Sequence, residues 1–259
     1  MKKLALDELL VERGFIPSKE EAKRYIMAGK ILIDDIVITK PGTLCNPKSR
    51  VRLKEKKSEF VSRGGDKIWH FIEKNNINVK DKCCLDIGIS TGGFSDVLLR
   101  KEALHILGID VGYGILDYQL RRNNQLSLLE RTNAREVTKE EINTTIQKHH
   151  LSAEDIQLVV MDVSFISIFK ILPNLIEILE PTTEYLVLVK PQFEAPKEMV
   201  DIGGIITSED DLKNTLNKVE ENLHKLNFNI KISEPSQLKG AKGNQEFFYY
   251  LNLNNTTSE

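Results

Sequence analysis

Short apolar runs alternate with segments of helical periodicity through the larger part of the chain. The runs lie at residues 83–85, 103–109, 126–130, 157–161 and 184–189, and helical patterns follow at 94–100, 166–179 and 208–226. A strand buried on both faces reads as a continuous apolar run, and a helix between parallel strands makes the crossover. Two last runs, 228–232 and 247–253, have no helix between them, which indicates an antiparallel hairpin at one edge. The pattern predicts an α/β fold with a parallel sheet covered on both faces.

The first 60 residues follow a different pattern. Residues 4–13 have helical spacing and end at Gly14, and Ser18 with Glu21 forms a capping box for a second helix that closes at Gly29. The β-branched run 31–39 is broken by Asp34-Asp35 and predicts a tight hairpin, and 51–53 alternates like a short strand. A charged segment poor in apolar residues suggests a linker at 56–62. We therefore expect a small α+β domain over residues 1–60 and a larger domain over 61–259.

Charge divides along the same boundary. The formal net charge is -2, but residues 1–60 carry 14 Lys and Arg against 9 Asp and Glu, and the remainder carries 22 against 29. A basic module attached to an acidic domain suggests that the module binds an anionic polymer. The cations expected to form a phosphate-contacting face are Arg13, Lys19, Lys23, Arg24 and Lys30. A solvated surface would explain any one of them taken alone.

The positions of the cysteines and the composition of the N-terminus argue against a metal-binding, disulfide-rich, secreted or membrane protein. Cys45, Cys83 and Cys84 form no C-x-x-C pair and have no histidine nearby, which argues against a zinc site and against a disulfide framework. No sustained apolar region follows the lysines at the N-terminus, and no run approaches the length of a membrane span. We expect a cytoplasmic protein with no resident metal.

A glycine-rich turn follows the first apolar run of the larger domain, in Asp86-Ile87-Gly88-Ile89-Ser90-Thr91-Gly92-Gly93-Phe94. The strand–turn–helix order resembles a nucleotide-type site, and the first amides of the helix form a seat for an anion. The spacing matches neither a P-loop nor G-x-G-x-x-G, and no lysine stands where a P-loop needs one. A carboxylate ligand such as the methionyl end of S-adenosylmethionine suits this turn better, with Asp86 facing the ammonium group.

A second carboxylate follows about 20 residues beyond the turn, where Asp110 is placed to bind ribose hydroxyls. The residues that we expect to bind the cofactor are Asp86, Gly88, Ser90, Thr91, Gly92, Gly93, Phe94, Asp110, Val111, Asn133 and Asp162. The alternative is that Asp86 and Asp110 are solvated loop acids and that the glycines only form a turn.

Four polar residues stand where the loops at the carboxyl edge of the sheet should meet. Asp162 and Lys190 each end an apolar run, Lys67 lies in the helix expected from residue 63, and Glu246 begins the last run. An unpaired ammonium buried after a run such as 186–189 would be costly, so Lys190 should be paired or chemically active. A purely structural ion pair of Asp162 with Lys190 or Lys67 explains any one of these residues equally well.

The first domain resembles the S4-type RNA-binding domain. The similarity rests on Leu9-Leu10-Val11-Glu12-Arg13-Gly14, on Ser18 through Ala28-Gly29-Lys30, on Ile31-Leu32-Ile33 and on Lys40-Pro41-Gly42. It implies docking onto structured RNA through shape and backbone contacts. Asp34-Asp35 departs from the Asn-Gly usual at that hairpin.

Nearly the whole chain resembles the TlyA family, often labelled haemolysin A, and Lys67, Asp162, Lys190 and Glu246 match the tetrad of FtsJ-like ribose 2′-O-methyltransferases. The matching segments are Ser62-Arg63-Gly64-Gly65-Asp66-Lys67, residues 86–94, Asp162-Val163-Ser164-Phe165-Ile166-Ser167, Leu188-Val189-Lys190-Pro191-Gln192-Phe193-Glu194 and Gly243-Asn244-Gln245-Glu246. The resemblance implies a Rossmann-like sheet and S-adenosylmethionine-dependent 2′-O-methylation of cytidine in ribosomal RNA, with ribosomal RNA or ribosomal subunits as partners.

The resemblance also implies roles for single residues. Lys190 would remove or steer the proton of the ribose hydroxyl, Glu246 would orient a lysine or the ribose, and Arg63 would join the RNA contacts. The segment 120–125 lacks the acidic residue expected near position 123, which leaves the contacts around the third strand open.

Three other functions compete with this interpretation. A haemolysin would need a membrane-active segment, a non-catalytic RNA-binding factor would not need the four polar residues, and a small-molecule methyltransferase would not need the basic module. The loop 192–206 is long enough to act as a lid or an RNA contact, and a passive surface loop is an equal alternative.

Overall fold

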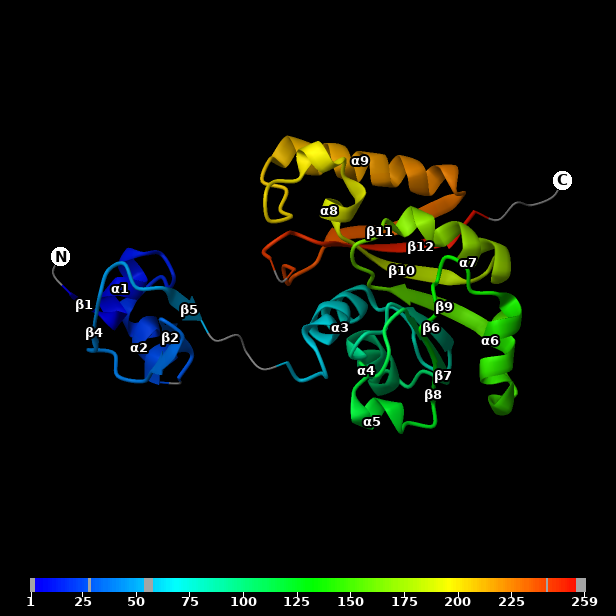
Figure 1. Ribbon diagram of the computed structural model, residues 1–259, viewed down its shortest axis with the longest axis horizontal. Helices are drawn as coiled ribbons and strands as arrows, with labels where there is room; N and C mark the ends of the chain where they lie inside the picture. The colour runs from blue at the N-terminus through cyan, green and yellow to red at the C-terminus, as the bar shows by residue number, and fades with distance from the viewer. Residues whose placement is uncertain (1–2, 28, 54–57, 241, 255–259) are drawn as a thin grey trace. The chain divides into compact units, whose positions relative to one another are not determined.

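The computed structural model describes residues 3–27, 29–53, 58–240 and 242–254. The chain separates into two compact units, Met1–Lys57 and Ser58–Glu259 (Figure 1). Two sequence expectations touch residues outside the described ranges: Ala28 in the S4-like run, and Lys56 and Lys57 at the start of the expected linker.

The first unit combines two helices with two small sheets. Its elements are β1 (Leu4–Ala5), α1 (Leu6–Glu12), α2 (Lys19–Met27), β2 (Ile31–Ile33), β3 (Ile36–Ile38), β4 (Leu44–Cys45) and β5 (Val51–Leu53). Strand β1 pairs with β4, and a second sheet has the order β3-β2-β5. The expectation of a helix from residue 4 was wrong for its first two residues, because Leu4 and Ala5 pair with Cys45 and Leu44.

The hairpin at Asp34-Asp35 forms as expected. Both residues have positive φ, 49° and 66°, which is the backbone that a two-residue type I′ turn requires. Asp34 accepts hydrogen bonds from the amide of Arg50 and the hydroxyl of Ser49, and Asp35 pairs with Arg52 at 2.7 Å. Side-chain acceptors therefore hold a conformation that Asn-Gly would adopt with less strain.

The second unit is built on one seven-stranded sheet. Its elements are α3 (Arg63–Asn75), β6 (Cys83–Ile87), α4 (Gly93–Arg100), β7 (His105–Asp110), α5 (Tyr118–Arg121), β8 (Leu126–Glu130), α6 (Lys139–Ile146), η1 (Gln147–His149), η2 (Ala153–Asp155), β9 (Ile156–Met161), η3 (Ile168–Lys170), α7 (Leu172–Ile178), β10 (Glu184–Val189), α8 (Pro191–Glu194), η4 (Lys197–Met199), α9 (Glu209–Lys225), β11 (Phe228–Pro235) and β12 (Phe247–Leu253).

The order of the strands is β11-β12-β10-β9-β6-β7-β8, and β12 runs antiparallel to both of its neighbours (Figure 1). This confirms the expected parallel sheet with an antiparallel hairpin at one edge. From β6 the chain continues outward to β7 and β8, and it then crosses back to β9 on the other side of β6 and continues to β10. The strand order therefore reverses between β6 and β9. Ligands of such sheets bind beyond the carboxyl ends of the strands at that point.

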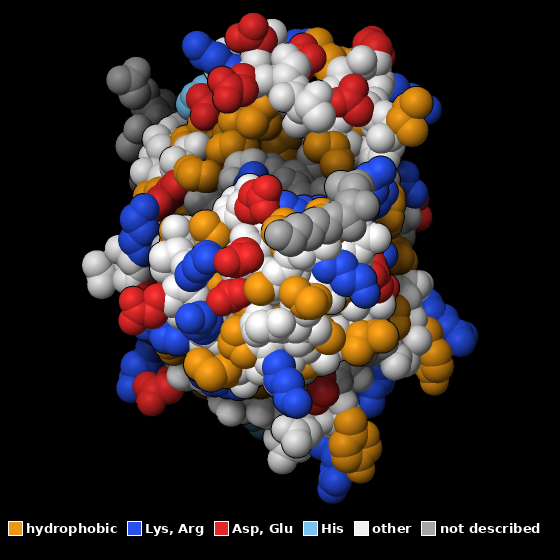
Figure 2. Space-filling model, turned by 90° about the vertical axis from the view of Figure 1, so that its left-hand side faces the viewer, with side chains coloured by type: hydrophobic (Ala, Val, Ile, Leu, Met, Phe, Trp, Pro, Cys, Tyr) orange, Lys and Arg blue, Asp and Glu red, His pale blue; other side chains and the backbone are white. Residues whose placement is uncertain are grey.

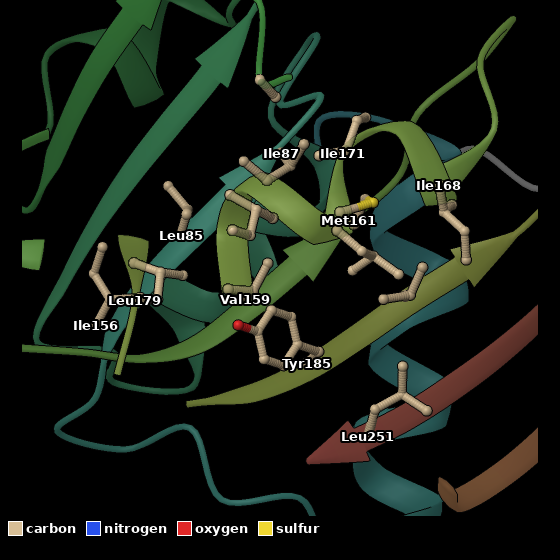
Figure 3. Packing of buried hydrophobic residues seen from close by; sticks show 14 of the residues in the cluster. Leu85, Ile87, Ile156, Val159, Met161, Ile168, Ile171, Leu179, Tyr185 and Leu251 are labelled. Atoms are coloured by element: carbon tan, nitrogen blue, oxygen red, sulfur yellow. The ribbon is translucent and has the colours of Figure 1, made fainter. Parts of the chain in front are cut away.

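Successive side chains of each central strand enter different cores. On β6, Leu85 packs in the core covered by α6, α7 and α9, whereas Cys84 packs in the core beneath α3 and α4. On β10, Tyr185 and Val187 join the first core and Leu186 joins the second. Figure 3 shows part of the first core, where Leu85, Val159, Tyr185 and Leu251 come from four adjacent strands. The period of two explains why these strands read as unbroken apolar runs.

Several expected elements differ in extent. The helix expected over 166–179 is divided into η3 and α7, and Pro173 stands in the first turn of α7, where a missing amide hydrogen does no harm. Strand β11 continues to Pro235, three residues further than expected. Helices α5 and α6 were not predicted from the sequence. Among the described residues, no helix is both long and apolar enough to cross a bilayer.

An ion-pair network joins the amino ends of β6, β10 and β11. It lies on the edge of the sheet opposite the carboxyl ends of the parallel strands. Glu184 at the start of β10 accepts from Lys82 at 2.6 Å and from Lys231 of β11 at 2.8 Å. Burial alone would raise the pKa of Glu184, but the hydrogen bonds from Lys231 and Lys82 outweigh it and lower the pKa to about 2.

We expect Glu184→Gln to weaken the dependence of stability on acid pH. A carboxylate with a lowered pKa stabilises the folded state above its unfolded pKa of about 4.5, and this contribution is lost as the pH falls toward about 2. Urea denaturation between about pH 5 and about pH 3 should show a smaller fall in unfolding free energy for Glu184→Gln than for the unmodified protein. Glu154→Gln, which removes an exposed pair with Lys139, is the control. Parallel pH curves for all three proteins would contradict the prediction.

Candidate functional site

The glycine turn after β6 brings backbone to within contact distance of the neighbouring strand tip. Gly88 has φ +82°, and a Cβ built on it would lie 2.7 Å from the carbonyl oxygen of Asp162, beyond the end of β9. Gly92 has φ +95° and precedes α4. Both positions therefore favour glycine because of the left-handed backbone, and at position 88 a Cβ would also meet a backbone oxygen.

Asp86 is buried below this turn. Its Oδ2 accepts a hydrogen bond of 2.6 Å from the hydroxyl of Ser95 on α4. Burial raises the pKa of Asp86 to about 7; the bond from Ser95 opposes that rise, and the charge of Asp162 adds to it. A buried carboxylate with a raised pKa is prepared to pair with a cation supplied by a ligand.

Asp110 ends β7 and fastens the turn to that strand. Its Oδ2 accepts from the amide of Ser90 at 2.8 Å, and its Oδ1 accepts from the amide of Gly112 at 2.7 Å. Each carboxylate oxygen has a further lone pair, so Asp110 keeps the capacity to accept from ligand hydroxyls. Val111 follows and is largely exposed beside it.

Two neighbouring cavities open at the carboxyl edge of the sheet. One, of about 270 Å³, is lined by residues that include Asp110, Val111, Asn133, Asp162 and Ile166. The other, of about 410 Å³, is lined by Ser62, Arg63, Gly64, Lys67, Asp86, Gly88, Ile89, Ser90, Thr91, Gly93, Phe94, Asp162, Ser164 and Lys190. Gly88, Ser90, Asp162 and Ser164 border both. A ligand that extends past Gly88 would therefore occupy both cavities.

The structure brings the four polar residues of the strand ends together as two ion pairs. Lys67 on α3 lies 2.5 Å from Glu246, and Lys190 after β10 lies 2.6 Å from Asp162 after β9. Lys67, Asp162 and Lys190 line the larger cavity, and Glu246 reaches it through Lys67. Both amines therefore belong to one cavity that also contains the glycine turn.

Each pair is fixed by a further contact. The ammonium group of Lys190 also donates a 2.7 Å hydrogen bond to the hydroxyl of Ser164. Glu246 is 3% exposed, and a Cβ on Gly240 would lie 2.5 Å from its Oε1, so a larger residue at position 240 would displace the carboxylate. Arg63 donates to the carbonyl oxygen of Lys239 and so connects the start of α3 to the same loop.

Sequence reasoning gave no role to three residues that organise the site. Ser95 holds Asp86, Ser164 holds Lys190, and Glu194 accepts from the hydroxyl of Ser167 and the amide of Ile168. Burial raises the pKa of Glu194. Glu194 thereby ties the segment after Lys190 to the segment after Asp162. The signals in the sequence were the nearness of these polar residues to strand ends and, for Ser164 and Glu194, their place in segments that match the family.

The remaining expected cofactor residues are distributed around the two cavities. Thr91, Gly93 and Phe94 line the larger one, and Asn133 lines the smaller one. The Oδ1 of Asn133 accepts from the amide and the guanidinium of Arg135. Gly92 lies outside both linings and acts as the cap of α4.

The cations expected to contact RNA are partly neutralised within the first unit. Lys19 pairs with Glu8 at 2.7 Å, Lys23 lies 4.0 Å from Asp7, and Arg13 donates to the carbonyl oxygen of Ser49. Lys30 lies over the ring of Tyr25, and Arg24 stands in the last turn of α2. Figure 2 shows both signs of charge interspersed on the face in view. Arg63 belongs to the second unit.

Comparisons with known proteins agree with the division of the chain into two units. A family model described as FtsJ-like methyltransferase matches residues 60–253, and one for the S4 domain matches 6–51. The chain is 35% identical over 251 residues to the 16S/23S rRNA (cytidine-2'-O)-methyltransferase TlyA of Mycobacterium tuberculosis, covering 96% of this chain and 90% of that protein. It is 34% identical over 248 residues to the Hemolysin A of Brachyspira hyodysenteriae, covering 96% and 99%. A solved structure of a candidate hemolysin from Streptococcus thermophilus superimposes with a TM-score of 0.72 at 32% identity, covering 98% and 90%.

We expect Gly88→Ala to destabilise the protein more than Gly114→Ala. Both glycines have positive φ, but only the Cβ at position 88 meets a backbone oxygen, whereas nothing lies within 4 Å of the Cβ at position 114. The left-handed backbone should cost about 1 kcal/mol at each site, and the clash with Asp162 should bring Gly88→Ala to about 2–4 kcal/mol. Urea midpoints measure the difference, and equal losses would show that the close approach is not rigid.

Proposed function

The chain belongs to the FtsJ-like methyltransferase family together with the TlyA proteins, and on that premise we propose that it methylates the ribose 2′-hydroxyl of a cytidine in ribosomal RNA with S-adenosylmethionine as donor. The observation that carries the proposal is the pairing of two lysines with two carboxylates on one cavity that contains the glycine turn. A ribose hydroxyl is a weak nucleophile, and amines fixed beside it supply the electrostatics that its reaction needs.

The residues of the glycine turn fit the cofactor by charge and by shape. Asp86 is a buried carboxylate that an ammonium group would neutralise, and the amides that open α4 suit a carboxylate. Asp110, in the adjoining cavity, would accept from the ribose hydroxyls of the adenosine. The bound cofactor would supply an electrophilic methyl group on a sulfonium.

Lys190 would position the acceptor hydroxyl. Its ammonium group donates to Ser164 and lies 2.6 Å from Oδ1 of Asp162, and it keeps an N–H that can be donated to the ribose 2′-oxygen. In this arrangement the ammonium orients the hydroxyl oxygen toward the methyl group and stabilises the negative charge that develops on that oxygen as the hydroxyl proton passes to solvent water. Holding two reactants in line supplies much of the acceleration in such a transfer.

Lys67 would act on the other side of the same cavity. Its pair with Glu246 fixes the position of the amine, and the residue is only 9% exposed. A second amine there would donate to the sugar oxygens of the target nucleotide. Glu246 would therefore orient a lysine, the first of the two roles that the family resemblance implied for it.

Recognition of RNA would fall to the S4-like unit. Its excess of basic residues supports binding to phosphates, and the M. tuberculosis relative acts on 16S and 23S ribosomal RNA by name. Arg13, Arg24 and Lys30 are the cations of the expected face that pair with no carboxylate among the described residues; Arg13 donates to the carbonyl oxygen of Ser49, and Lys30 lies over the ring of Tyr25. We propose that these three make phosphate contacts.

The relative called Hemolysin A raises membrane damage as a second candidate. The two activities separate in one preparation of purified protein, tested for release of haemoglobin from erythrocytes and for transfer of a labelled methyl group to ribosomal subunits. Methyl transfer without lysis supports the proposal, and lysis without methyl transfer contradicts it.

We expect the affinity for S-adenosylmethionine to rise with pH. Burial raises the pKa of Asp86 to about 7, and only the ionised carboxylate pairs with the ligand's ammonium. Binding should therefore strengthen about tenfold between about pH 6 and about pH 8. Calorimetry across this range should give a flat, weaker profile for Asp86→Asn and an unchanged profile for Glu136→Gln, a surface control. A flat profile for the unmodified protein would remove Asp86 from the cofactor site.

We expect Lys190→Ala to abolish methyl transfer while cofactor affinity stays within about twofold. The variant loses the donor to the ribose oxygen, and removal of a group that stabilises developing charge costs about 10²-fold or more in rate. Single-turnover transfer to ribosomal subunits and calorimetry with S-adenosylmethionine measure the two effects. Lys170→Ala removes an exposed lysine and is the matched control. Full activity of Lys190→Ala would contradict the assignment.

A further inference from the structure

A third cavity, of about 360 Å³, lies on the other side of Lys67 from the active site. Its walls come from α3 and from the strands β11 and β12 with the turn between them. Lys67 lines both this cavity and the larger one of the active site, so the same side chain borders both. None of the functions considered so far uses this space.

The third cavity lies along one stripe of α3. Arg63, Lys67, His70 and Lys74 follow each other at intervals of four, three and four residues and so share a face of the helix. Arg63 borders the active-site cavity, Lys67 borders both cavities, and His70 and Lys74 border the third. Seven residues of helix separate Lys67 from Lys74, a distance of about 10 Å.

Two ion pairs close the ends of the third cavity. Lys67 pairs with Glu246 at one end, and Lys74 pairs with Glu234 at the other, where Asn75 also donates to Glu234. Each ammonium thus faces a carboxylate, and the wall carries little net charge. A phosphate or a free anion would find no unpaired cation at these ends, so the cavity suits an uncharged group.

The floor and the rim favour a flat ligand with hydrogen-bonding edges. Phe71 and Phe248 form the floor, with ring centroids 4.8 Å apart. His70, Gln237 and Gln245 supply polar groups at the rim. The amide nitrogen of Gln245 donates to the carbonyl oxygens of Ser236 and Glu246, bonds that do not engage its own carbonyl oxygen. Imidazole and amide groups can each donate and accept, as the edge of a nucleobase requires.

We propose that this cavity binds the base of the nucleotide next to the methylated one on the same RNA strand. The inference rests on the proposed function. A strand whose ribose is held between Lys67 and Lys190 passes over Lys67 to reach the third cavity, so the neighbouring nucleotide is the group delivered there. Gln245 immediately precedes Glu246, and Lys67 forms the shared wall. Correct seating of that base therefore sets the position of the Lys67–Glu246 pair.

The test first maps the methylated cytidine in ribosomal RNA by the unmodified protein. Transcripts of that region are then made with each of the four bases at the position before and the position after the target. Single-turnover methyl transfer from labelled S-adenosylmethionine is measured for the unmodified protein, His70→Ala, Gln237→Ala and Gln147→Ala. Gln147 is an exposed amide on η1 and serves as the matched control.

The unmodified protein and Gln147→Ala should prefer one base, at one of the two positions, by about tenfold or more, which corresponds to about one hydrogen bond. His70→Ala or Gln237→Ala should reduce that preference to about twofold. Neither variant should change the transfer rates for the four bases at the other position, or the cofactor affinity. A variant with only a structural defect would lower transfer to all transcripts equally.

Two results would overturn the inference and leave the proposed function standing: equal transfer to every transcript, or an undiminished preference in both variants. Absence of any methyl transfer by the unmodified protein would instead overturn the proposed function. As an independent readout, 4-thiouridine at the preferred position should crosslink within residues 63–75 or 234–248 on irradiation. Crosslinks confined to other segments would also contradict the inference.

Discussion

The cost of burying an amine determines how this active site is assembled. Lys67 and Lys190 stand where apolar strands and a packed helix meet, and an ammonium left without a partner there would be strongly destabilising. Each finds a carboxylate within 2.6 Å, but the two carboxylates come from different strand ends. The sheet must therefore have its full order, with β12 beside β10, before both charges are compensated. The constraint that stabilises the fold at this edge also brings both amines to one cavity.

Glycine at a few positions makes that gathering possible. Gly88 lets the turn after β6 touch the backbone of Asp162, and Gly240 leaves room for the carboxylate of Glu246. The serines act at the next level, since Ser95 and Ser164 each direct a charged group toward a cavity. Lysines and carboxylates thus supply the charges, glycines leave space for them, and serines orient them. The position of each residue depends on the neighbouring strand that it must contact.

Much of this arrangement could be predicted from the sequence, because it follows from local patterns. Apolar runs gave the strands of the sheet nearly to the residue, as for 126–130 and 184–189, and the polar residues after them gave the edge where ligands bind. The hairpin at Asp34-Asp35 followed from two short polar residues between β-branched runs. The family resemblance, carried by five short segments, gave the identity of the four polar residues.

The rest depended on three-dimensional register. Whether Asp162 pairs with Lys67 or with Lys190 cannot be decided without the positions of α3 and β10. The helix expected at 166–179 is divided just before Pro173, a residue that favours the first turn of a helix, and Ile168 and Ile171 before that turn pack in the first core. The cavity beside Lys67 combines residues of α3 with others some 160 positions away, as the Lys74–Glu234 contact shows, and no periodicity announces such a meeting.

The pair between Lys67 and Glu246 spans 179 positions of the chain. Contacts that close so long a loop are among the last to form, because the entropy of closure is recovered only when the intervening strands are in place. The N-terminal unit has a separate core of its own. The first unit could therefore fold and bind nucleic acid before the second unit is complete. Methyl transfer, in contrast, would require that the whole seven-stranded sheet had formed.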